Sequence, residues 1–306
     1  MRSQIWRSQT WIAFASPSLA LIGAWAMAGN AFAAAQTGPA SVIEAEYAFA
    51  SSTKPLGVRG AFLKFLAADS ILCSPAPVNG ITSTAAGKPN ADTLEWYPTH
   101  SQTAGSGDLG YTMGPWTYRT ADGKTQRHGT FLSVWRKQPD GAWRVVVDCG
   151  VSQPEPDVAP AGLPMPPLAG GATSTAASRT PAPSASWTDP VAAADARFTS
   201  ASARGAAAAL KMFAAPDVRV MTGGVATAVG TEAGQALLST RKLGTMWQHV
   251  FASQSEDGTL GYTWGYIGDA QAEKPAAVYV NVWRRASAGA PWQIVAQSLQ
   301  ILPQKS

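Results

Sequence analysis

Asp108-Leu109-Gly110-Tyr111-Thr112-Met113-Gly114-Pro115-Trp116 has a counterpart later in the chain, Thr259-Leu260-Gly261-Tyr262-Thr263-Trp264-Gly265-Tyr266-Ile267. Leu109 and Leu260 are 151 residues apart. Two further segments recur in the same order. Val134-Trp135-Arg136 matches Val282-Trp283-Arg284 at an offset of 148, and Trp143 matches Trp292 at an offset of 149. Three matches in one order at nearly one spacing indicate a duplicated domain.

The first 33 residues differ in kind from the rest. Arg2 and Arg7 precede an uncharged, apolar run from Trp11 to Met27, and Ala31-Phe32-Ala33 follows it. This pattern predicts a secretory signal peptide, residues 1–33, cleaved near Ala33 or Ala35. The protein is then periplasmic or secreted, with no membrane association after cleavage. An uncleaved anchor is the alternative, but the apolar run is marginal in length for one.

The charge balance argues against a nucleic-acid partner. The 306 residues carry a formal net charge of +4, which falls to +2 without Arg2 and Arg7. Phosphate backbones require clustered lysine and arginine side chains, and no segment of the chain offers such a cluster. The hydrophobic content of 46% is enough for two ordinary cores.

Both cysteines, Cys73 and Cys149, fall in the first half of the chain. An exported protein can oxidise them, but the sequence does not fix the distance between their Cα atoms, so a disulfide stays open. The second half has other residues at the corresponding places, so the fold does not require a bridge.

The chain divides into a first copy (34–151), a linker (152–189) and a second copy (190–306). Eight of the 38 linker residues are proline, which predicts an extended segment between two separable domains. Apolar periodicity and turn residues predict the same order of elements in each copy. The expected helices are 42–52, 58–68 and 87–96, then 191–200, 203–214 and 231–242. The expected strands are 70–73, 98–105, 108–119, 127–137 and 142–151, then 218–222, 246–255, 259–268, 276–286 and 291–301.

This α+β order resembles the nuclear transport factor 2-like superfamily, in its SnoaL-like or ketosteroid-isomerase-like branch. The residues that carry the resemblance are Ala67 to Leu72, the Gly-Tyr-Thr strand and Val134 to Val146. It covers about 110 residues in each copy. It implies two copies of a curved antiparallel sheet wrapped around three helices, as a cone-shaped α+β barrel with a pocket at one end. It also implies sheet-to-sheet pairing, either of the two copies within one chain or in a homo-oligomer.

Some members of this superfamily are isomerases with a carboxylate base just after the first short strand. The resemblance places that position at about Ser74 in the first copy and Thr222 in the second. Neither hydroxyl is a base near neutral pH without a partner. The family's oxyanion tyrosine corresponds to Tyr47, but the second copy has Arg197 or Phe198 there. Isomerase chemistry is therefore not the first expectation.

The sequence offers three weak catalytic candidates, which are Tyr47, His100 and Asp148. No H-x-x-x-H pattern or carboxylate–histidine spacing predicts a metal site, and no motif predicts a cofactor. Strand alternation places Asp148 with Arg144 and opposite Trp143, which predicts an outward or rim position.

Aromatic residues are the better candidates for binding. Trp135, Trp143, Trp283 and Trp292 are expected in the cores. The predicted function is an exported tandem module that binds a small apolar or amphipathic ligand or pairs its own domains. The alternative is an isomerase- or cyclase-like enzyme acting in the first-copy pocket. The predicted ligand-binding residues are Tyr47, Trp96, Tyr111, Met113, Trp247, Tyr262 and Trp264.

Overall fold

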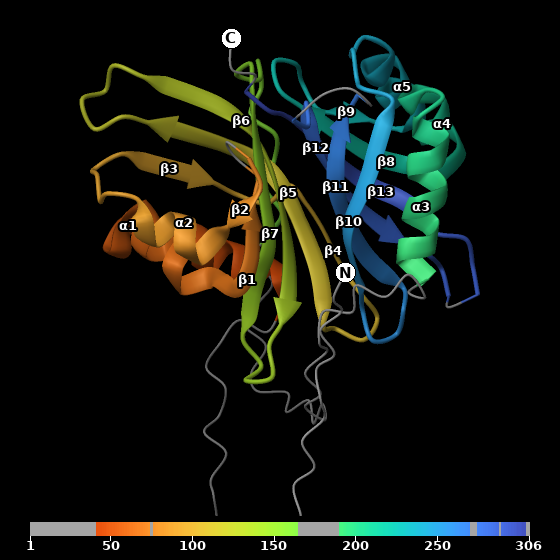
Figure 1. Ribbon diagram of the computed structural model, residues 1–306. Helices are drawn as coiled ribbons and strands as arrows, with labels where there is room; N and C mark the ends of the chain where they lie inside the picture. The colour runs from red at the N-terminus through yellow and green to blue at the C-terminus, as the bar shows by residue number, and fades with distance from the viewer. Residues whose placement is uncertain (1–40, 74–75, 165–189, 270–273, 288, 304–306) are drawn as a thin grey trace, which may run out of the picture. The chain divides into compact units, whose positions relative to one another are not determined.

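The structure is a computed structural model that describes residues 41–73, 76–164, 190–269, 274–287 and 289–303. The predicted signal peptide, Ser74 and linker residues 165–189 lie outside the described residues. Within the described part, five helices accompany two mixed sheets, which confirms the α+β class (Figure 1). None of these helices combines the length and the apolar character needed to cross a membrane.

The first copy opens with helix α1 (Val42–Phe65). Ser41 Oγ accepts a hydrogen bond from the Glu44 backbone N–H, and Glu44 Oε2 accepts one from the Ser41 N–H. This reciprocal pair satisfies two backbone donors at the start of the helix. The two helices expected here form one element that kinks at Gly57, whose φ of 67° is accessible to glycine.

Helix α2 (Gly80–Ala86) is capped by Asn79, whose side chain accepts from the Thr82 N–H. The helix predicted at 87–96 is wrong, because β3 (Thr93–Trp96) occupies that region. Gly87 ends α2, and Pro89 soon after it prevents the helix from continuing.

The first sheet has the strand order β2-β1-β7-β6-β5-β3, with β4 also paired to β5. Strand β1 runs parallel to β7, so the sheet is mixed rather than wholly antiparallel. The strand path joins no ends among the described residues, so the predicted barrel is an open sheet. Its strands are β1 (Leu66–Leu72), β2 (Val78–Asn79), β3, β4 (His100–Thr103), β5 (Leu109–Arg119), β6 (Gln126–Lys137) and β7 (Trp143–Gln153).

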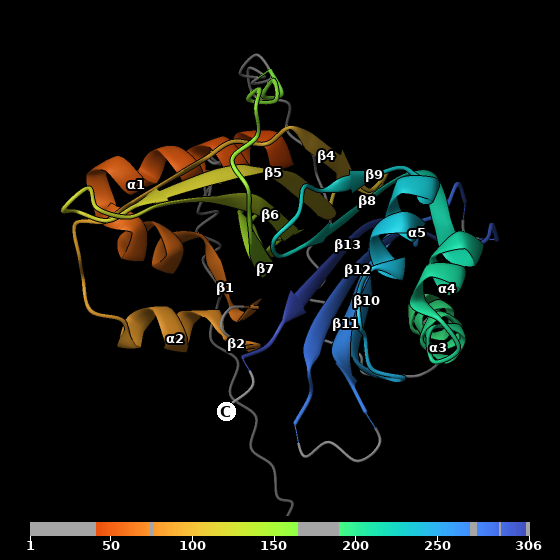
Figure 2. The same cartoon turned by 90° about the horizontal axis from the view of Figure 1, so that it is seen from above.

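The second copy repeats this connectivity, with the order β10-β11-β12-β13-β8-β9 and β8 parallel to β13. Its helices lie on one face of its sheet, as α1 and α2 do in the first copy (Figure 2). Two sheets of matching order fit a tandem repeat. The elements are α3 (Pro190–Ser202), α4 (Ala206–Phe213), α5 (Thr231–Ser239), β8 (Ala214–Thr222), β9 (Ala228–Val229), β10 (Met246–Gln254), β11 (Leu260–Gly268), β12 (Ala277–Arg284) and β13 (Gln293–Ile301).

Each sheet has a helix-facing side and an outer side, and the outer sides of both copies contribute to one buried core cluster. Polar contacts between the copies border this cluster. Arg136 Nη2 donates to Ser253 Oγ at 2.6 Å, and the Ser106 N–H donates to Asp257 Oδ2 at 2.9 Å. The cluster includes Tyr111, Met113, Leu132, Val134, Met221, Tyr262, Val280 and Val282.

The first part of the linker is bonded to the first copy. The Leu163 N–H donates to the Pro98 carbonyl at 2.8 Å, and the Tyr97 hydroxyl donates to the Pro160 carbonyl at 2.9 Å. Gly162 permits this approach, because a Cβ there would lie 3.0 Å from the Tyr97 ring. The described part of the linker is thus fixed to the first copy by these hydrogen bonds.

Cys73 and Cys149 form a disulfide bond, with Cα atoms 4.9 Å apart. The bond links the segment just after β1 to β7. The structure therefore contains the disulfide that the sequence left open.

Candidate ligand-binding site

A cavity of about 390 Å³ lies within the first copy. Its volume falls in the range of small-molecule pockets, and its wall is mainly aromatic and aliphatic with a few polar groups. The lining comes from α1, β1, β3, β5, β6 and β7. The lining residues are Phe62, Leu72, Cys73, Leu94, Trp96, Trp116, Tyr118, Arg127, Phe131, Asp148, Gly150 and Ser152.

Two glycines make room for the Trp116 indole in this wall. A Cβ on Gly129 would lie 2.4 Å from Trp116 Cζ2, and one on Gly150 would lie 3.4 Å from Trp116 Nε1. The indole Nε1–H is buried and has no hydrogen-bond partner in the described structure. A buried donor without a partner keeps its full desolvation cost.

Asp148 supplies the carboxylate of the cavity. Its Oδ2 accepts a hydrogen bond from Ser133 Oγ at 3.0 Å, and the side chain is half-buried. Burial raises the pKa of Asp148 to about 6, while the bond from Ser133 lowers it in part. An acid with this pKa changes protonation close to neutral pH.

The predicted outward position of Asp148 is wrong, because the strand contains a bulge. Val134 pairs with Val147 and Trp135 pairs with Val145, which leaves Val146 as an extra residue on β7. A bulge shifts the alternation of every residue after it. Trp143 and Asp148 therefore both point to the helix-facing side, although simple alternation places them on opposite faces.

Glu46 is a second acid near the cavity, and sequence reasoning missed it. It is fully buried and accepts hydrogen bonds from Trp96 Nε1 at 2.5 Å, Thr112 Oγ1 at 2.5 Å and Trp135 Nε1 at 2.9 Å. Burial raises the pKa of Glu46 to about 7, and the nearby Asp148 charge adds to the rise. Because Trp96 lines the cavity, Glu46 positions part of its wall.

A sequence signal for Glu46 did exist. Val42, Glu46 and Phe49 follow the i, i+4, i+7 spacing of one helix face, so the acid shares the apolar face of α1. Asp195 lies 149 residues after Glu46, which is the offset of the repeat. An acid retained on a buried face in both copies indicates a polar centre in each core.

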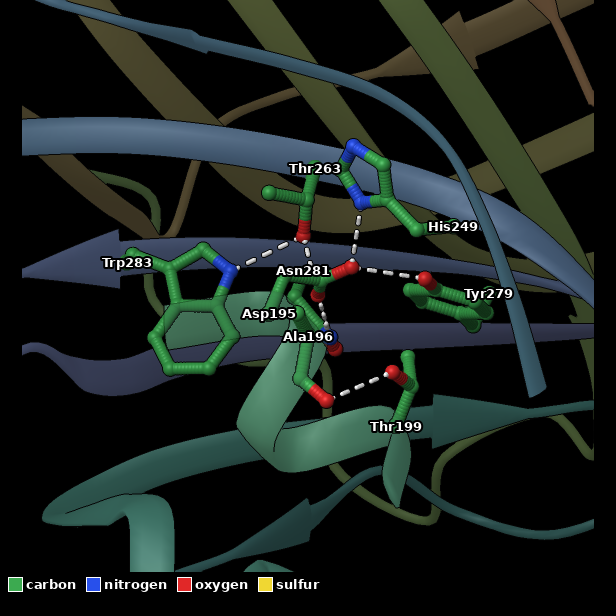
Figure 3. Close-up of polar contacts among 8 residues, drawn as sticks. All are labelled: Asp195, Ala196, Thr199, His249, Thr263, Tyr279, Asn281 and Trp283. Carbon is green, nitrogen blue, oxygen red and sulfur yellow. Dashed lines mark hydrogen bonds and ion pairs between the residues drawn. The ribbon is translucent and has the colours of Figure 1, made fainter. Parts of the chain in front are cut away.

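Asp195 is the centre of the equivalent cluster in the second copy (Figure 3). It is fully buried, and both of its oxygens are engaged. Trp283 Nε1 completes the cluster by donating to Thr263 Oγ1 at 2.9 Å. The contacts of Asp195 are Thr263 Oγ1 at 2.6 Å, Tyr279 OH at 2.7 Å, His249 Nδ1 at 2.7 Å and Asn281 Nδ2 at 3.2 Å.

The second copy has different residues at the places of Trp116, Gly129 and Gly150. Strand pairing puts Ile267, Ala277 and Leu299 where Trp116, Gly129 and Gly150 stand in the first copy. All three aliphatic residues are buried. Gln297 stands in place of Asp148, and its Nε2 donates to Asn281 Oδ1 at 2.8 Å. The tryptophan, the glycines and the carboxylate at these places are therefore features of the first copy.

Trp96 and Asp148 lie on the cavity wall, but four other candidates do not. Tyr111, Met113, Tyr262 and Trp264 belong to the outer-face core shared by the two copies or pack against it. The reason is again alternation. On β5, Thr112 bonds Glu46 on the helix-facing side, so its neighbours Tyr111 and Met113 point away.

The remaining candidates are dispersed. His100 Nε2 lies 2.8 Å from the Tyr111 hydroxyl on the outer side, and burial together with the charge of Arg219 lowers the pKa of His100 to about 4. Tyr47 lines a separate hollow and donates its hydroxyl to the Leu163 carbonyl. Trp247 is buried in the helix-facing core of the second copy. No group of three metal-ligating side chains occurs among the described residues.

No protein-family model and no curated protein matches the chain. Solved structures do match, and three illustrate the result. A nuclear transport factor 2-like protein of unknown function from Shewanella oneidensis has 15% identity and covers 36% of this chain and 94% of its own, with a TM-score of 0.30. A ketosteroid isomerase-like protein from Erwinia carotovora atroseptica has 16% identity and covers 38% and 95%, with a TM-score of 0.31.

The third structure is a nuclear transport factor 2-like protein with a cystatin-like fold from Novosphingobium aromaticivorans. It has 20% identity and covers 38% of this chain and 82% of its own, with a TM-score of 0.29. Each match spans about the length of one repeat. In fold, this chain is similar to nuclear transport factor 2-like and ketosteroid isomerase-like proteins, as its sequence motifs predict.

Proposed function

We propose that the first copy binds a small, flat, largely apolar ligand in the cavity beside Asp148, and that the second copy is its structural partner. One observation carries the proposal. The two copies share a fold, yet Trp116 and Gly150 line a cavity of the first copy at places where the second copy has the buried aliphatic side chains of Ile267 and Leu299. A core of this fold can be filled, so the open space in the first copy is not a requirement of folding.

The chemistry of the wall supports a ring-shaped ligand. Trp96, Trp116 and Phe131 offer aromatic surface, which favours stacked or edge-to-face contact with another ring. Asp148 is the acidic side chain on the wall and fixes a polar end of the ligand.

We also infer that the mature chain acts outside the cytoplasm. The pattern of residues 1–33 supports export, and the bridge between Cys73 and Cys149 is compatible with an oxidising compartment. Detection of the processed chain in a periplasmic or culture fraction, with its N-terminus determined by mass spectrometry, tests this part. An unprocessed chain confined to the cytoplasm would contradict it.

Titration calorimetry with 2-naphthol tests the binding proposal, using the full mature chain. Gly150→Leu gives the first copy the residue that the second copy has at Leu299, and it should weaken binding at least tenfold by filling the cavity. Leu299→Val is the matched control in the second copy and should bind as the wild type does. Unchanged binding by a folded Gly150→Leu variant refutes the proposed site.

A second candidate function is proton-transfer catalysis of the isomerase or cyclase kind. The observation in its favour is Asp148, a carboxylate in an apolar cavity with its pKa raised to about 6. Against it, Asp148 bonds Ser133 and no tyrosine hydroxyl within the described residues. Turnover of a β,γ-unsaturated ketone that is abolished by Asp148→Asn would establish catalysis, whereas ligand binding without turnover favours the binding module.

A further inference from the structure

The contact between the two copies is built from matched hydrogen bonds. Arg136 Nη2 donates to Ser253 Oγ at 2.6 Å, and Arg284, the counterpart of Arg136 in the repeat, donates from Nη1 to Gln102 Oε1 at 3.5 Å. Gln102 and Ser253 also correspond, because each pairs with the tyrosine of the repeated Gly-Tyr-Thr strand. The same contact is therefore made once in each direction, and the interface has two equivalent halves.

The two halves differ at one ring. Phe251 packs against Tyr262 with ring centroids 5.7 Å apart, and His100 packs against Tyr111 at 5.5 Å. His100 and Phe251 occupy equivalent places, because their strands pair with corresponding residues of the next strand. The half around Tyr111 thus has a titratable ring where the half around Tyr262 has a benzene ring.

Cationic side chains of the second copy lie on the side of His100. Arg284 on β12 reaches Gln102, which is two residues after His100 and on the same face of β4. Arg219 on β8 adds a second cation, and strand pairing places it where the first copy has the uncharged Ile71. The two halves therefore differ in charge as well as in their rings.

The ionisable groups that act on His100 are Arg219, Arg284, Asp217 and its neighbour Tyr111. Burial and the charge of Arg219 lower the pKa of His100 to about 4, Arg284 adds to this effect, and Asp217 opposes it. Asp217 is itself paired with Arg284, whose Nη2 lies 3.0 Å from its Oδ1. The second copy thus presents an excess of positive charge to the imidazole.

The hydrogen bond of His100 also depends on its protonation. Its Nε2 lies 2.8 Å from the hydroxyl of Tyr111, a side chain that is fully buried. A neutral imidazole with its proton on Nδ1 accepts the hydroxyl hydrogen at Nε2, whereas an imidazolium has no acceptor nitrogen. The described contacts give the Tyr111 hydroxyl no other hydrogen bond, so protonation leaves a buried donor without a partner.

We propose that protonation of His100 weakens the Tyr111 half of the interface, so that acid loosens the contact between the two copies on this side and leaves the Phe251 side closed. The folded-state pKa of about 4 lies below the ordinary value of 6.5, so the closed interface binds fewer protons between these values. The stabilising contribution of the neutral imidazole is therefore complete above about pH 6.5 and is lost as pH falls towards 4.

Urea unfolding of the full mature chain at pH 7.5 and pH 5 tests the proposal. His100→Phe gives this half the ring of the other half and removes the titration. The unfolding equilibrium constant of the wild type, divided by that of His100→Phe, should rise about tenfold between pH 7.5 and 5. All other titrating groups are shared, so their effects cancel in this ratio. His100→Gln serves in the same way if His100→Phe does not fold.

Arg219→Ile tests whether the effect crosses the copies, because it removes a facing cation and supplies the residue of the first copy. The rise should fall to roughly threefold in this background. Phe251→Leu is the matched control in the other half and should keep the full rise. A rise that is absent from the wild type, or one that stays complete in Arg219→Ile, overturns the proposal.

Hydroxyl-radical footprinting read by mass spectrometry locates the loosening. Met113 pairs with His100, and Trp264 is the equivalent partner of Phe251. Oxidation of Met113 should increase about tenfold at pH 5 in the wild type and stay unchanged in His100→Phe, with Trp264 unchanged in both. Unchanged Met113 in the wild type refutes the loosening, and an equal increase at Trp264 refutes its restriction to one half.

Discussion

Trp96 Nε1 donates a hydrogen bond to Glu46 Oε1 at 2.5 Å, so a fully buried acid on α1 fixes a ring of the cavity wall. The same acid binds Thr112 and Trp135 on two strands. The site is thus built on the polar centre of the core. A change at Glu46 is expected to alter both stability and the shape of the cavity.

We predict that the protein becomes less stable as pH rises from about 5 to 8. The pKa of Glu46 is raised to about 7 in the folded state, above its ordinary value of 4.5, so the folded state binds more protons between these values. Its stabilising contribution is therefore complete below about pH 4.5 and is lost as pH rises through 7. The shift corresponds to about 3 kcal/mol.

Urea unfolding at pH 5, 6, 7 and 8 measures this dependence. In Glu46→Gln the free energy of unfolding should depend less on pH, since an amide does not titrate in this range. Asp148→Asn should remove a smaller part of the pH dependence, between pH 4 and 6. A Glu46→Gln variant that keeps the wild-type slope would show that another group is responsible.

Binding of a hydroxyl ligand should weaken in acid. The pKa of Asp148 is about 6, so at pH 5 roughly a tenth of the molecules retain the carboxylate that accepts the ligand hydroxyl. The affinity for 2-naphthol should fall up to about tenfold between pH 7.5 and 5, while that for naphthalene stays constant. In Asp148→Asn the dependence should vanish, and its persistence there would assign the titration to a different residue.

The two glycines beside Trp116 should respond differently to alanine. A Cβ on Gly129 would lie 2.0 Å from the Val151 carbonyl oxygen, which is backbone and cannot move away cheaply. Gly129→Ala should cost about 1–3 kcal/mol or more through overpacking. Gly150→Ala meets Trp116 Nε1 at an ordinary 3.4 Å and should change stability by less than about 0.5 kcal/mol. Thermal unfolding compares the two variants, and equal Tm values would contradict the described packing.

Sequence patterns predicted the architecture better than the site, for a physical reason. Repeat spacing and turn residues depend on local chemistry, so the order of strands and the burial of Trp143 and Trp292 were predictable. Which face of a strand meets the helices is not local information. Tyr111 and Thr112 are adjacent, and only the contact between Thr112 and Glu46 identifies the inner face.

The bulge at Val146 was similarly invisible in the sequence. Period-two alternation assumes an unbroken ladder, and one extra residue reverses it for everything that follows. Asp148 was assigned to the wrong face for this reason. The Glu46 spacing and its repeat at Asp195 were visible, but a carboxylate in the first two turns of a helix is more often explained by the helix dipole.

The final prediction concerns the coupling of the two copies. A proline-rich linker alone predicts that each copy unfolds by itself, but residues of both copies share one buried core, and Arg136 bonds Ser253 across the copies. Trp143 is 2% exposed and packs in the helix-facing core of the first copy. Trp143→Ala should cost roughly 3–5 kcal/mol. Because the copies share a core, we expect one calorimetric transition that shifts to lower temperature as a whole.

Trp292→Ala makes the equivalent change in the second copy and should shift the same transition. Arg136→Ala tests the coupling directly, since it removes a hydrogen bond between the copies and leaves both helix-facing cores intact. It should bring the Trp143→Ala variant closer to two separate transitions. Two well-resolved transitions in the wild type, each lowered only by the tryptophan variant of its own copy, would mean that the shared core contributes too little to couple the unfolding of the two repeats.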